Sequence, residues 1–277
     1  MPRQPVLFIH GLWIHSSAWQ PWVERYRRAG YDPVVAGWPG DGETVEDTRR
    51  RADRVGGYGV AEVVKHYAEL IARLPQPPVV VGHSFGGLIA QRLLDDGHAV
   101  AAVAIDPAPI KGVTKLPLSQ IRSTLPVLRS RSNREGAVTL TERQFRYAIA
   151  NAIPRDEAHD LYERWSIPAP GKPLFEVVGA KKDPASPTAV DTANARRGPL
   201  LIIGGGRDHI VAESVSWAAA DLYARSNAVT DYHVFADRGH SLVIDSRWRE
   251  VADYTIGWIN AQQFRSARPA TSADGQQ

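Results

Sequence analysis

The chain has no cysteine among its 277 residues and only one methionine. Without thiols it can form neither a disulfide nor a cysteine-ligated zinc site, and no thiolate can serve as a nucleophile. This absence agrees with a reducing compartment, and we predict a cytoplasmic protein.

Long hydrophobic runs are also lacking. No apolar stretch approaches the roughly 18 residues that a membrane span requires. Residues 1–9 contain only a short apolar run, without the hydrophobic region and cleavage site of a signal peptide. We therefore expect no membrane span and no secretory leader.

The charge balance gives no sign of a nucleic-acid partner. The net charge is only +3, and the arginine clusters at 49–54 and 129–134 interleave no aromatic residues. Neither cluster belongs to a nucleic-acid-binding motif. We interpret both clusters as solvated faces and predict that the protein binds no nucleic acid.

What the chain does contain is a series of short apolar segments separated by helix-like stretches. The apolar segments are continuous rather than alternating, as in strands covered on both faces. This order predicts an α/β fold with a mostly parallel sheet of about six strands flanked by helices. The predicted strands are 6–9, 33–36, 79–81, 100–105, 200–203 and 232–235, and the predicted helices are 19–29, 60–74, 88–96, 213–225 and 247–261.

The alternation stops between residues 107 and 197, where only two amphipathic helices, 141–152 and 154–165, are visible. In parallel sheets, ligands bind beyond the carboxyl ends of the strands. We therefore predict a core of residues 1–106 and 198–262 with a helical cap, 107–197, over that edge. A separate small helical domain is the alternative. Residues 263–277 are polar and rich in small residues, which predicts a disordered tail.

The segment from Gly82 to Gly87 reads Gly-His-Ser-Phe-Gly-Gly and lies between a predicted strand and a predicted helix. Gly-x-Ser-x-Gly at such a corner is typical of a nucleophile elbow, in which Ser84 is exposed on a sharp turn. Small residues at 82 and 86 let the strand and the helix approach each other. Ser84 is therefore the candidate nucleophile.

A serine nucleophile requires a base, and the base requires an orienting group. His240 follows the last predicted strand and is the candidate base. Asp208, in the loop after the preceding strand, is the favoured acid, because its strand neighbours the one that leads to His240 and the glycines of its loop permit a sharp turn. Asp106 and, more weakly, Asp237 are the alternatives.

The developing oxyanion needs at least two donors. One is expected to be the backbone N–H of Phe85, directly after the nucleophile. The other should come from the loop after the first strand, where we favour Leu12 over Trp13. Together these groups predict acyl transfer through a covalent acyl-enzyme.

These motifs, in this order along nearly the whole chain, resemble the α/β-hydrolase superfamily. Ser84 separates the sequence from the haloalkane dehalogenases and epoxide hydrolases, which have aspartate there. The form Gly-His-Ser-Phe-Gly-Gly is similar to small esterases, lipases and cofactor-free haloperoxidases or perhydrolases. The family usually has two more strands before its His-Gly motif, here His10-Gly11, so the resemblance implies a shortened sheet.

The resemblance implies a serine hydrolase that cleaves carboxylic esters of small to medium lipophilic substrates. The same residues could instead run perhydrolysis, acyl transfer, C–C hydrolysis or lyase chemistry, or the scaffold could serve as a ligand-binding receptor. Trp13, Tyr162, Trp165 and Trp217 are candidate pocket walls, with core packing as the alternative.

The same reading predicts no cofactor and no metal site. The histidines at 10, 15, 83 and 209 lack the spacing of a metal motif. His10 is expected to hydrogen-bond the backbone near the oxyanion loop. The expected partner is a small-molecule ester, and the protein is expected to be a monomer or a homodimer.

Overall fold

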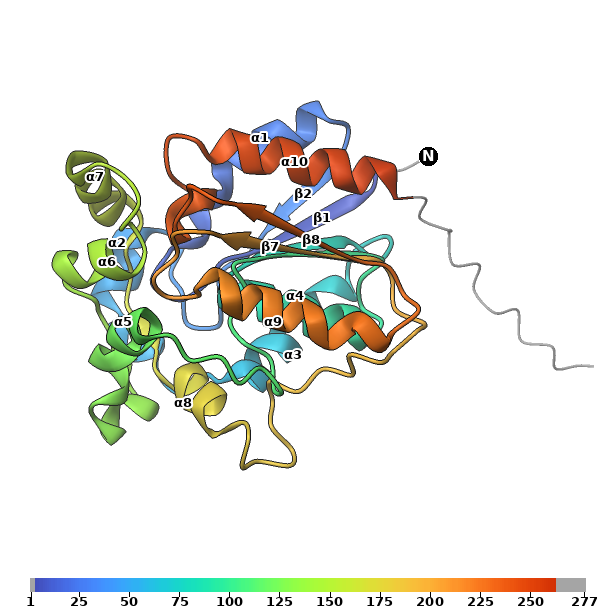
Figure 1. Cartoon of the computed structure of the whole chain (residues 1–277). Helices are drawn as coiled ribbons and strands as arrows, with labels where there is room; N and C mark the ends of the chain where they lie inside the picture. Colours follow the sequence, from blue (N-terminus) through green and yellow to red (C-terminus); the bar gives the residue numbers. More distant parts are fainter. Residues whose placement is uncertain (1–2, 263–277) are drawn as a thin grey trace, which may run out of the picture.

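A computed structural model describes residues 3–262 and contains a sheet of six parallel strands (Figure 1). The order across the sheet is β2-β1-β3-β4-β7-β8, and every adjacent pair is parallel. The predicted parallel sheet of about six strands is therefore confirmed. The strands are β1 (Pro5–Ile9), β2 (Asp32–Val35), β3 (Val79–His83), β4 (Ala101–Ile105), β7 (Leu200–Gly205) and β8 (Thr230–Phe235).

Helices cover both faces of the sheet, which explains why its central strands are continuously apolar. Every residue of β1, β3, β4 and β7 is buried. On one face lie α1 (Gln20–Arg28) and α10 (Trp248–Ala261) (Figure 1). On the other lie α3 (Val60–Ile71), α4 (Phe85–Asp95) and α9 (Glu213–Leu222). Two apolar clusters, one on each side of the sheet, form the core.

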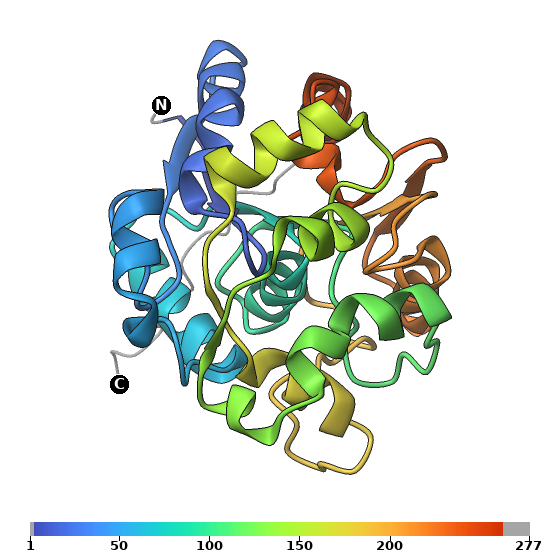
Figure 2. The same cartoon turned by 90° about the vertical axis from the view of Figure 1, so that its left-hand side faces the viewer.

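The chain leaves the sheet after β4 and returns at β7, and we call residues 106–199 the insertion. Its helices are α5 (Leu118–Leu128), α6 (Glu142–Ala148), α7 (Arg155–Trp165) and α8 (Lys172–Gly179). They lie across the carboxyl ends of the strands (Figures 1 and 2). The two helices predicted here are confirmed as α6 and α7, although α6 is shorter than expected.

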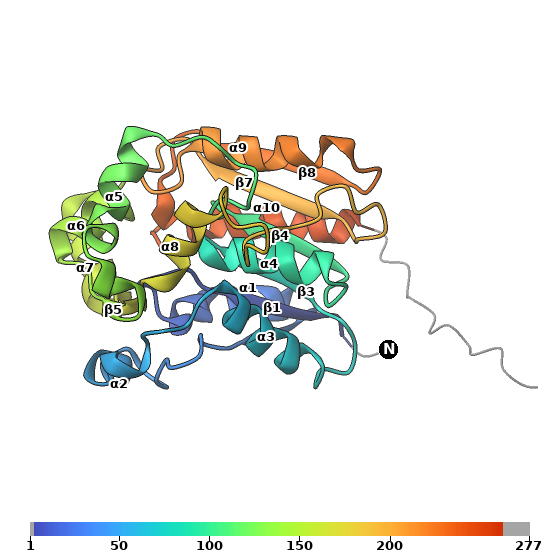
Figure 3. The ribbon, with the colours of Figure 1, turned by 90° about the horizontal axis from the view of Figure 1, so that it is seen from below.

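The sequence reading missed two helices and a small antiparallel pair in the insertion. The pair, β5 (Ala137–Val138) and β6 (Ala169–Pro170), is too short to leave a pattern. Helix α5 contains Pro126, a residue that normally interrupts helices. Helix α8 is short, with a proline in its first turn. Figure 3 shows α5 and α8 beside the sheet edge, seen from below.

The remaining elements are short. Helix α2 (Val45–Arg50) begins at Thr44, whose side chain accepts a hydrogen bond from the Asp47 N–H. The 3-10 turns are η1 (Ser16–Trp19), η2 (Ala52–Arg54), η3 (Arg131–Arg134), η4 (Tyr223–Arg225) and η5 (His240–Val243).

The predicted disordered tail, 263–277, lies outside the described residues. Within residues 3–262, no helix is both long and apolar enough to span a bilayer.

Candidate active site

Ser84 lies at the sharp turn between β3 and α4, as the elbow motif predicts. Its φ of 57° and ψ of −121° place a non-glycine residue in a strained backbone region. A side chain at Gly82 would collide with the Gly86 carbonyl group, and one at Gly86 would collide with the Ile9 carbonyl group. Glycine at both positions is therefore a steric requirement of the turn.

Hydrogen bonds hold the elbow in this conformation. The Ser84 N–H donates to the Ile105 carbonyl oxygen of β4 at 2.9 Å. The Ser84 carbonyl oxygen accepts from the Gly87 N–H and from the Ala108 N–H, both at 2.9 Å. The nucleophile candidate is thus anchored to its own helix, to the neighbouring strand and to the start of the insertion.

His240 and Asp208 lie in hydrogen-bonding contact although 32 positions separate them. The Nδ1 atom of His240 is 2.5 Å from Oδ2 of Asp208, and both side chains are buried. The other oxygen, Oδ1 of Asp208, accepts the N–H groups of Ile210 and Val211 at 2.7 and 2.9 Å. Three donors therefore converge on this carboxylate and favour its charged form. Burial acts in the opposite direction and is the larger effect, and it raises the pKa of Asp208 to about 8.

The imidazole of His240 lies beside the elbow. The ring of His83, the residue before Ser84, is tilted against it with ring centroids 4.4 Å apart. Burial lowers the pKa of His240 to about 3 and lowers that of His83 well below its usual value. Both rings are therefore neutral at neutral pH, as a general base must be.

The two alternative acids, Asp106 and Asp237, do not hydrogen-bond to His240. Asp106, at the end of β4, has a φ of 41°, and its Oδ2 is 4.0 Å from His240 Nδ1, beyond hydrogen-bonding distance. Its Oδ1 accepts the Gly205 N–H at 2.5 Å. Asp237 is more than half exposed and is paired with Arg247. Asp208 is thus the acid nearest to the imidazole.

Asp106 nevertheless belongs to the site. Its contact with Asp208 was not predicted from the sequence. Its carboxyl group lies within hydrogen-bonding distance of Asp208. Burial and the adjacent Asp208 charge raise the pKa of Asp106 well above its usual value. Its buried Oδ2 has no other partner within residues 3–262. A proton on Asp106 would give that oxygen a partner, because it could then donate to Asp208.

His83, Asp106 and His240 also form the only grouping of three possible metal ligands within residues 3–262. Their ligand atoms lie within 4.8 Å of one another. Because Nδ1 of His240 already contacts Asp208, only Nε2 of this ring is available as a further ligand. The prediction that the protein has no metal site stays a prediction.

The loop after β1 lies directly against Ser84. A Cβ on Gly11 would approach the Ser84 Cβ atom to 2.5 Å, so only glycine fits here. The expected backbone contact of His10 is confirmed, because its Nδ1 is 2.8 Å from the Gly11 carbonyl oxygen. Neither the Leu12 N–H nor the Phe85 N–H donates to another group of the described chain. Both are therefore available to a ligand.

The insertion is attached to this loop. The His15 N–H donates to the Trp165 carbonyl oxygen at 3.0 Å, and the Ile167 N–H donates to the Trp13 carbonyl oxygen at 3.2 Å. Only 6% of Ser84 is exposed. A cavity of only about 10 Å³ lies between the loop and residues 167–170. Ligand sites usually enclose about 300–1,000 Å³, so this conformation has no room for a ligand there.

The four predicted pocket aromatics lie on different elements, and their role as pocket walls stays a prediction. Trp13 is buried in the β1 loop, and its Nε1 donates to the Val138 carbonyl oxygen of the insertion at 3.0 Å. Tyr162 packs edge-on against the ring of Phe145 within the insertion. Trp165 is partly buried at the outer side of α7. Trp217 lies on α9 with 51% of its surface exposed, so we leave it out of the proposed site.

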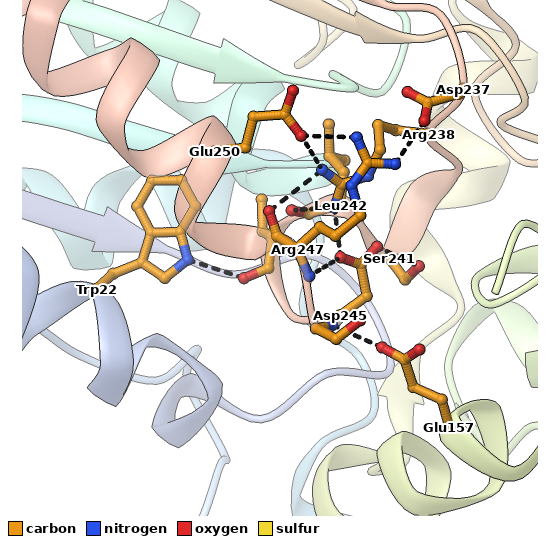
Figure 4. Close-up of polar contacts among 11 residues, drawn as sticks. Trp22, Glu157, Asp237, Arg238, Ser241, Leu242, Asp245, Arg247 and Glu250 are labelled. Carbon is orange, nitrogen blue, oxygen red and sulfur yellow. Dashed lines mark hydrogen bonds and ion pairs between the residues drawn. The ribbon is translucent and has the colours of Figure 1, made fainter. Parts of the chain in front are cut away.

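A buried ion pair fixes the segment that carries His240 (Figure 4). The Arg238 guanidinium contacts Asp245, and both side chains are almost fully buried. Asp245 also accepts the Ser241 hydroxyl group at 3.1 Å. On the opposite side, Trp22 Nε1 donates to the Val243 carbonyl oxygen at 2.8 Å. These contacts hold η5 from both sides.

Comparisons with known proteins agree with the fold. A family model described as "Alpha/beta hydrolase family" matches residues 6–254. No curated protein sequence matches the chain significantly.

Among solved structures, a monoacylglycerol lipase from Paleococcus ferrophilus is similar, with a TM-score of 0.64 and 21% identity over 92% of this chain and 93% of that one. A thermophilic esterase from Thermogutta terrifontis has a TM-score of 0.65 and 18% identity over 93% and 89% of the two chains. Tomato methylketone synthase I, complexed with 2-tridecanone, has a TM-score of 0.66 and 12% identity over 95% and 100%.

Proposed function

Since the chain belongs to the alpha/beta hydrolase family, we propose that it is a serine hydrolase that cleaves carboxylic esters through an acyl-enzyme on Ser84. The observation that carries this proposal is the contact of 2.5 Å between His240 and Asp208 beside the elbow. A buried, neutral imidazole held by a carboxylate next to a serine is the arrangement that activates a hydroxyl group.

The reaction follows from the roles of these groups. The Oγ atom of Ser84 attacks the ester carbonyl carbon, and Nε2 of His240 takes the hydroxyl proton. Asp208 keeps the Nδ1 proton in place and stabilises the imidazolium that forms. The N–H groups of Leu12 and Phe85 bind the oxyanion. His240 then protonates the leaving alcohol, and a water molecule activated by His240 releases the acid.

The proposed substrates are small to medium lipophilic esters, with lactones and thioesters as further candidates. The small cavity between the β1 loop and the insertion is lined mainly by Trp13, Ile167 and other apolar residues, with His10 and Asp41 among them. Such a lining favours an apolar acyl or alcohol group. The chain shares its fold with a lipase and an esterase, which supports an ester as the substrate class.

We further propose that the insertion acts as a cap that moves to admit substrate. With Ser84 almost fully covered, an ester of ordinary size cannot reach it in the closed conformation. The attachment of the insertion to the β1 loop is the contact that opening would release.

The decisive experiment compares wild type with Ser84→Ala on p-nitrophenyl esters of graded acyl length. We expect the variant to lose about 10⁶-fold in kcat, as other serine triads do. A fluorophosphonate should label the wild type with one equivalent and leave the variant unlabelled. Near-native turnover by Ser84→Ala would refute the proposal, and an unreactive wild type would favour a ligand-binding receptor.

A further inference from the structure

On an ordinary surface helix the apolar side chains are buried and the polar ones are exposed. Helix α5 in the insertion instead buries several polar side chains and exposes several apolar ones. Its buried positions include the polar residues Gln120, Ser123 and Thr124. Three of its apolar residues face solvent: Leu118, Ile121 and Leu125 are 84%, 41% and 54% exposed, whereas Val127 is buried.

These three residues are spaced three and four positions apart, so they form one stripe along the helix. Leu116, just before the helix, is 64% exposed and extends the stripe. We call Leu116, Leu118, Ile121 and Leu125 the α5 face. A helix that meets only water turns its apolar side inward, so this face is built to meet something apolar.

The segment that carries the α5 face is positively charged. Residues 107–134 contain no acidic residue and six basic ones: Lys111, Lys115, Arg122, Arg129, Arg131 and Arg134. A surface hollow beside Leu125 is lined by Arg122, Arg129 and Arg143. We call it the arginine hollow. None of its three arginines pairs with a carboxylate within residues 3–262. Instead, the Arg122 guanidinium lies 4.0 Å from the centroid of the Tyr147 ring.

Apolar side chains next to unpaired arginines match the two layers of an anionic lipid surface. Apolar residues enter the boundary between headgroups and acyl chains, and arginines meet the phosphate groups. We propose that the α5 face and the arginine hollow form a docking surface for an anionic lipid bilayer. A second copy of the chain fits less well, because it would bring two basic segments together.

The docking surface lies on the outer side of a helix that touches the site. On its inner side, the Ser123 hydroxyl group donates to the carbonyl oxygen of His209, the neighbour of Asp208, at 3.2 Å. Figure 2 views the face of the molecule that carries the insertion. Docking requires no chemistry at Ser84, so it is independent of the proposed function.

The test is cosedimentation of the full chain with phosphatidylcholine vesicles prepared with and without phosphatidylglycerol. We expect binding to the anionic vesicles only, weakening as salt screens the arginines. Replacing Leu118, Ile121 and Leu125 by serine should lower binding about tenfold or more, because less apolar surface is buried. Arg129→Glu with Arg143→Glu should lower it about fivefold or more per residue.

Matched controls keep the result specific. Val229 is an exposed apolar residue just before β8, at the amino ends of the strands and away from the insertion. The variant Val229→Ser should bind vesicles as wild type does. Ser84→Ala should also bind as wild type does, which separates docking from hydrolysis. Thermal melting checks folding, and Leu118→Ser alone serves if the triple variant does not fold.

Three outcomes would overturn the proposal. They are unchanged binding by a folded triple variant, equal binding to neutral and anionic vesicles, and no vesicle binding at all. A concentration-dependent dimer that the triple variant abolishes, without vesicle binding, would assign the α5 face to a second copy instead.

Discussion

At the scale of single residues, the site holds two buried carboxyl groups around one imidazole. Two carboxylates in such a place cannot both be charged without a large electrostatic cost. Asp208 accepts two backbone N–H groups and faces His240, whereas Asp106 accepts only the Gly205 N–H. The negative charge is therefore better stabilised on Asp208, and the proton belongs on Asp106.

This assignment predicts opposite results for two substitutions at Asp106. Asp106→Asn keeps a donor toward Asp208 and should retain kcat/KM within about tenfold of wild type. Asp106→Ala removes that donor, and the loss of a buried hydrogen bond to a charged group should cost about 10- to 100-fold. Steady-state kinetics on the best ester checks both. If Asp106→Ala were active and Asp106→Asn inactive, Asp106 would not donate a proton to Asp208 in a hydrogen bond.

The buried histidines predict how stability depends on pH. Burial lowers the pKa of His83 and His240 in the folded chain, whereas the unfolded chain takes up protons near pH 6.5. Below that pH the unfolded state binds more protons at these two histidines, so their contribution to stability is full above about 6.5 and falls as pH drops. The raised pKa values of Asp106 and Asp208 act in the opposite direction over the same range. Each histidine contributes a slope of about 1.4 kcal/mol per pH unit.

His83→Gln should reduce this slope by the contribution of one histidine. Urea unfolding of wild type and variant between pH 6.5 and 5 measures the difference. A His83 variant with the wild-type slope would show that this ring is protonated in the folded protein.

At the scale of elements, the position of His240 depends on the ion pair that holds η5. The Arg238 and Asp245 side chains are 3% and 2% exposed, so neither charge is compensated by water if its partner is removed. By contrast, Arg247 pairs with Asp237 and Glu250 at the surface, where about half of each side chain is exposed.

Arg238→Ala should therefore lower the free energy of unfolding by about 3–5 kcal/mol, because Asp245 is left buried and charged. Arg247→Ala, the matched surface variant, should cost about 0–1 kcal/mol. Chemical denaturation measures both values. Equal effects of the two substitutions would show that burial does not decide the contribution of these pairs.

Elements with a strong local pattern could be predicted from the sequence, and elements set by tertiary contacts could not. Strand β3 and the elbow follow from a continuous apolar run and two glycines, which are local signals. Helix α5 has the reverse pattern, since its buried side is polar. Asp106 follows β4 and Asp208 follows β7, and the whole insertion separates them in the sequence. Their contact therefore leaves no local pattern from which it could be predicted.

At the scale of the whole molecule, the insertion and the sheet enclose the site between them. The positions of Asp208 and His240 after neighbouring strands favoured a contact between them, because adjacent parallel strands end at one edge, while Asp106 and Asp237 stayed open as alternatives. The role of the aromatic residues as pocket walls stays a prediction, because it depends on how the insertion packs. Closure itself also could not be predicted from the sequence.

A disulfide would test whether the insertion must lift from the β1 loop. Ile14 and Ser166 form an isolated antiparallel bridge, a geometry in which Cα atoms are close enough for a disulfide. The chain has no other cysteine, so Ile14→Cys with Ser166→Cys would pair only with each other. We expect esterase activity to fall on oxidation and to return on reduction.

The single variant Ile14→Cys controls for the loss of the isoleucine side chain and should not respond to redox state. Mass spectrometry confirms that the bond has formed. Full activity of the oxidised double variant would mean that substrate enters without movement at this bridge.

The parallel sheet also determines how the protein can be tethered. Strand β1 begins, and helix α10 ends, at the edge remote from the insertion (Figure 1). An affinity handle fused at either terminus would therefore orient an immobilised molecule with its insertion outward. Sensor chips coated in this way would offer the reactive side to vesicles or esters flowing past.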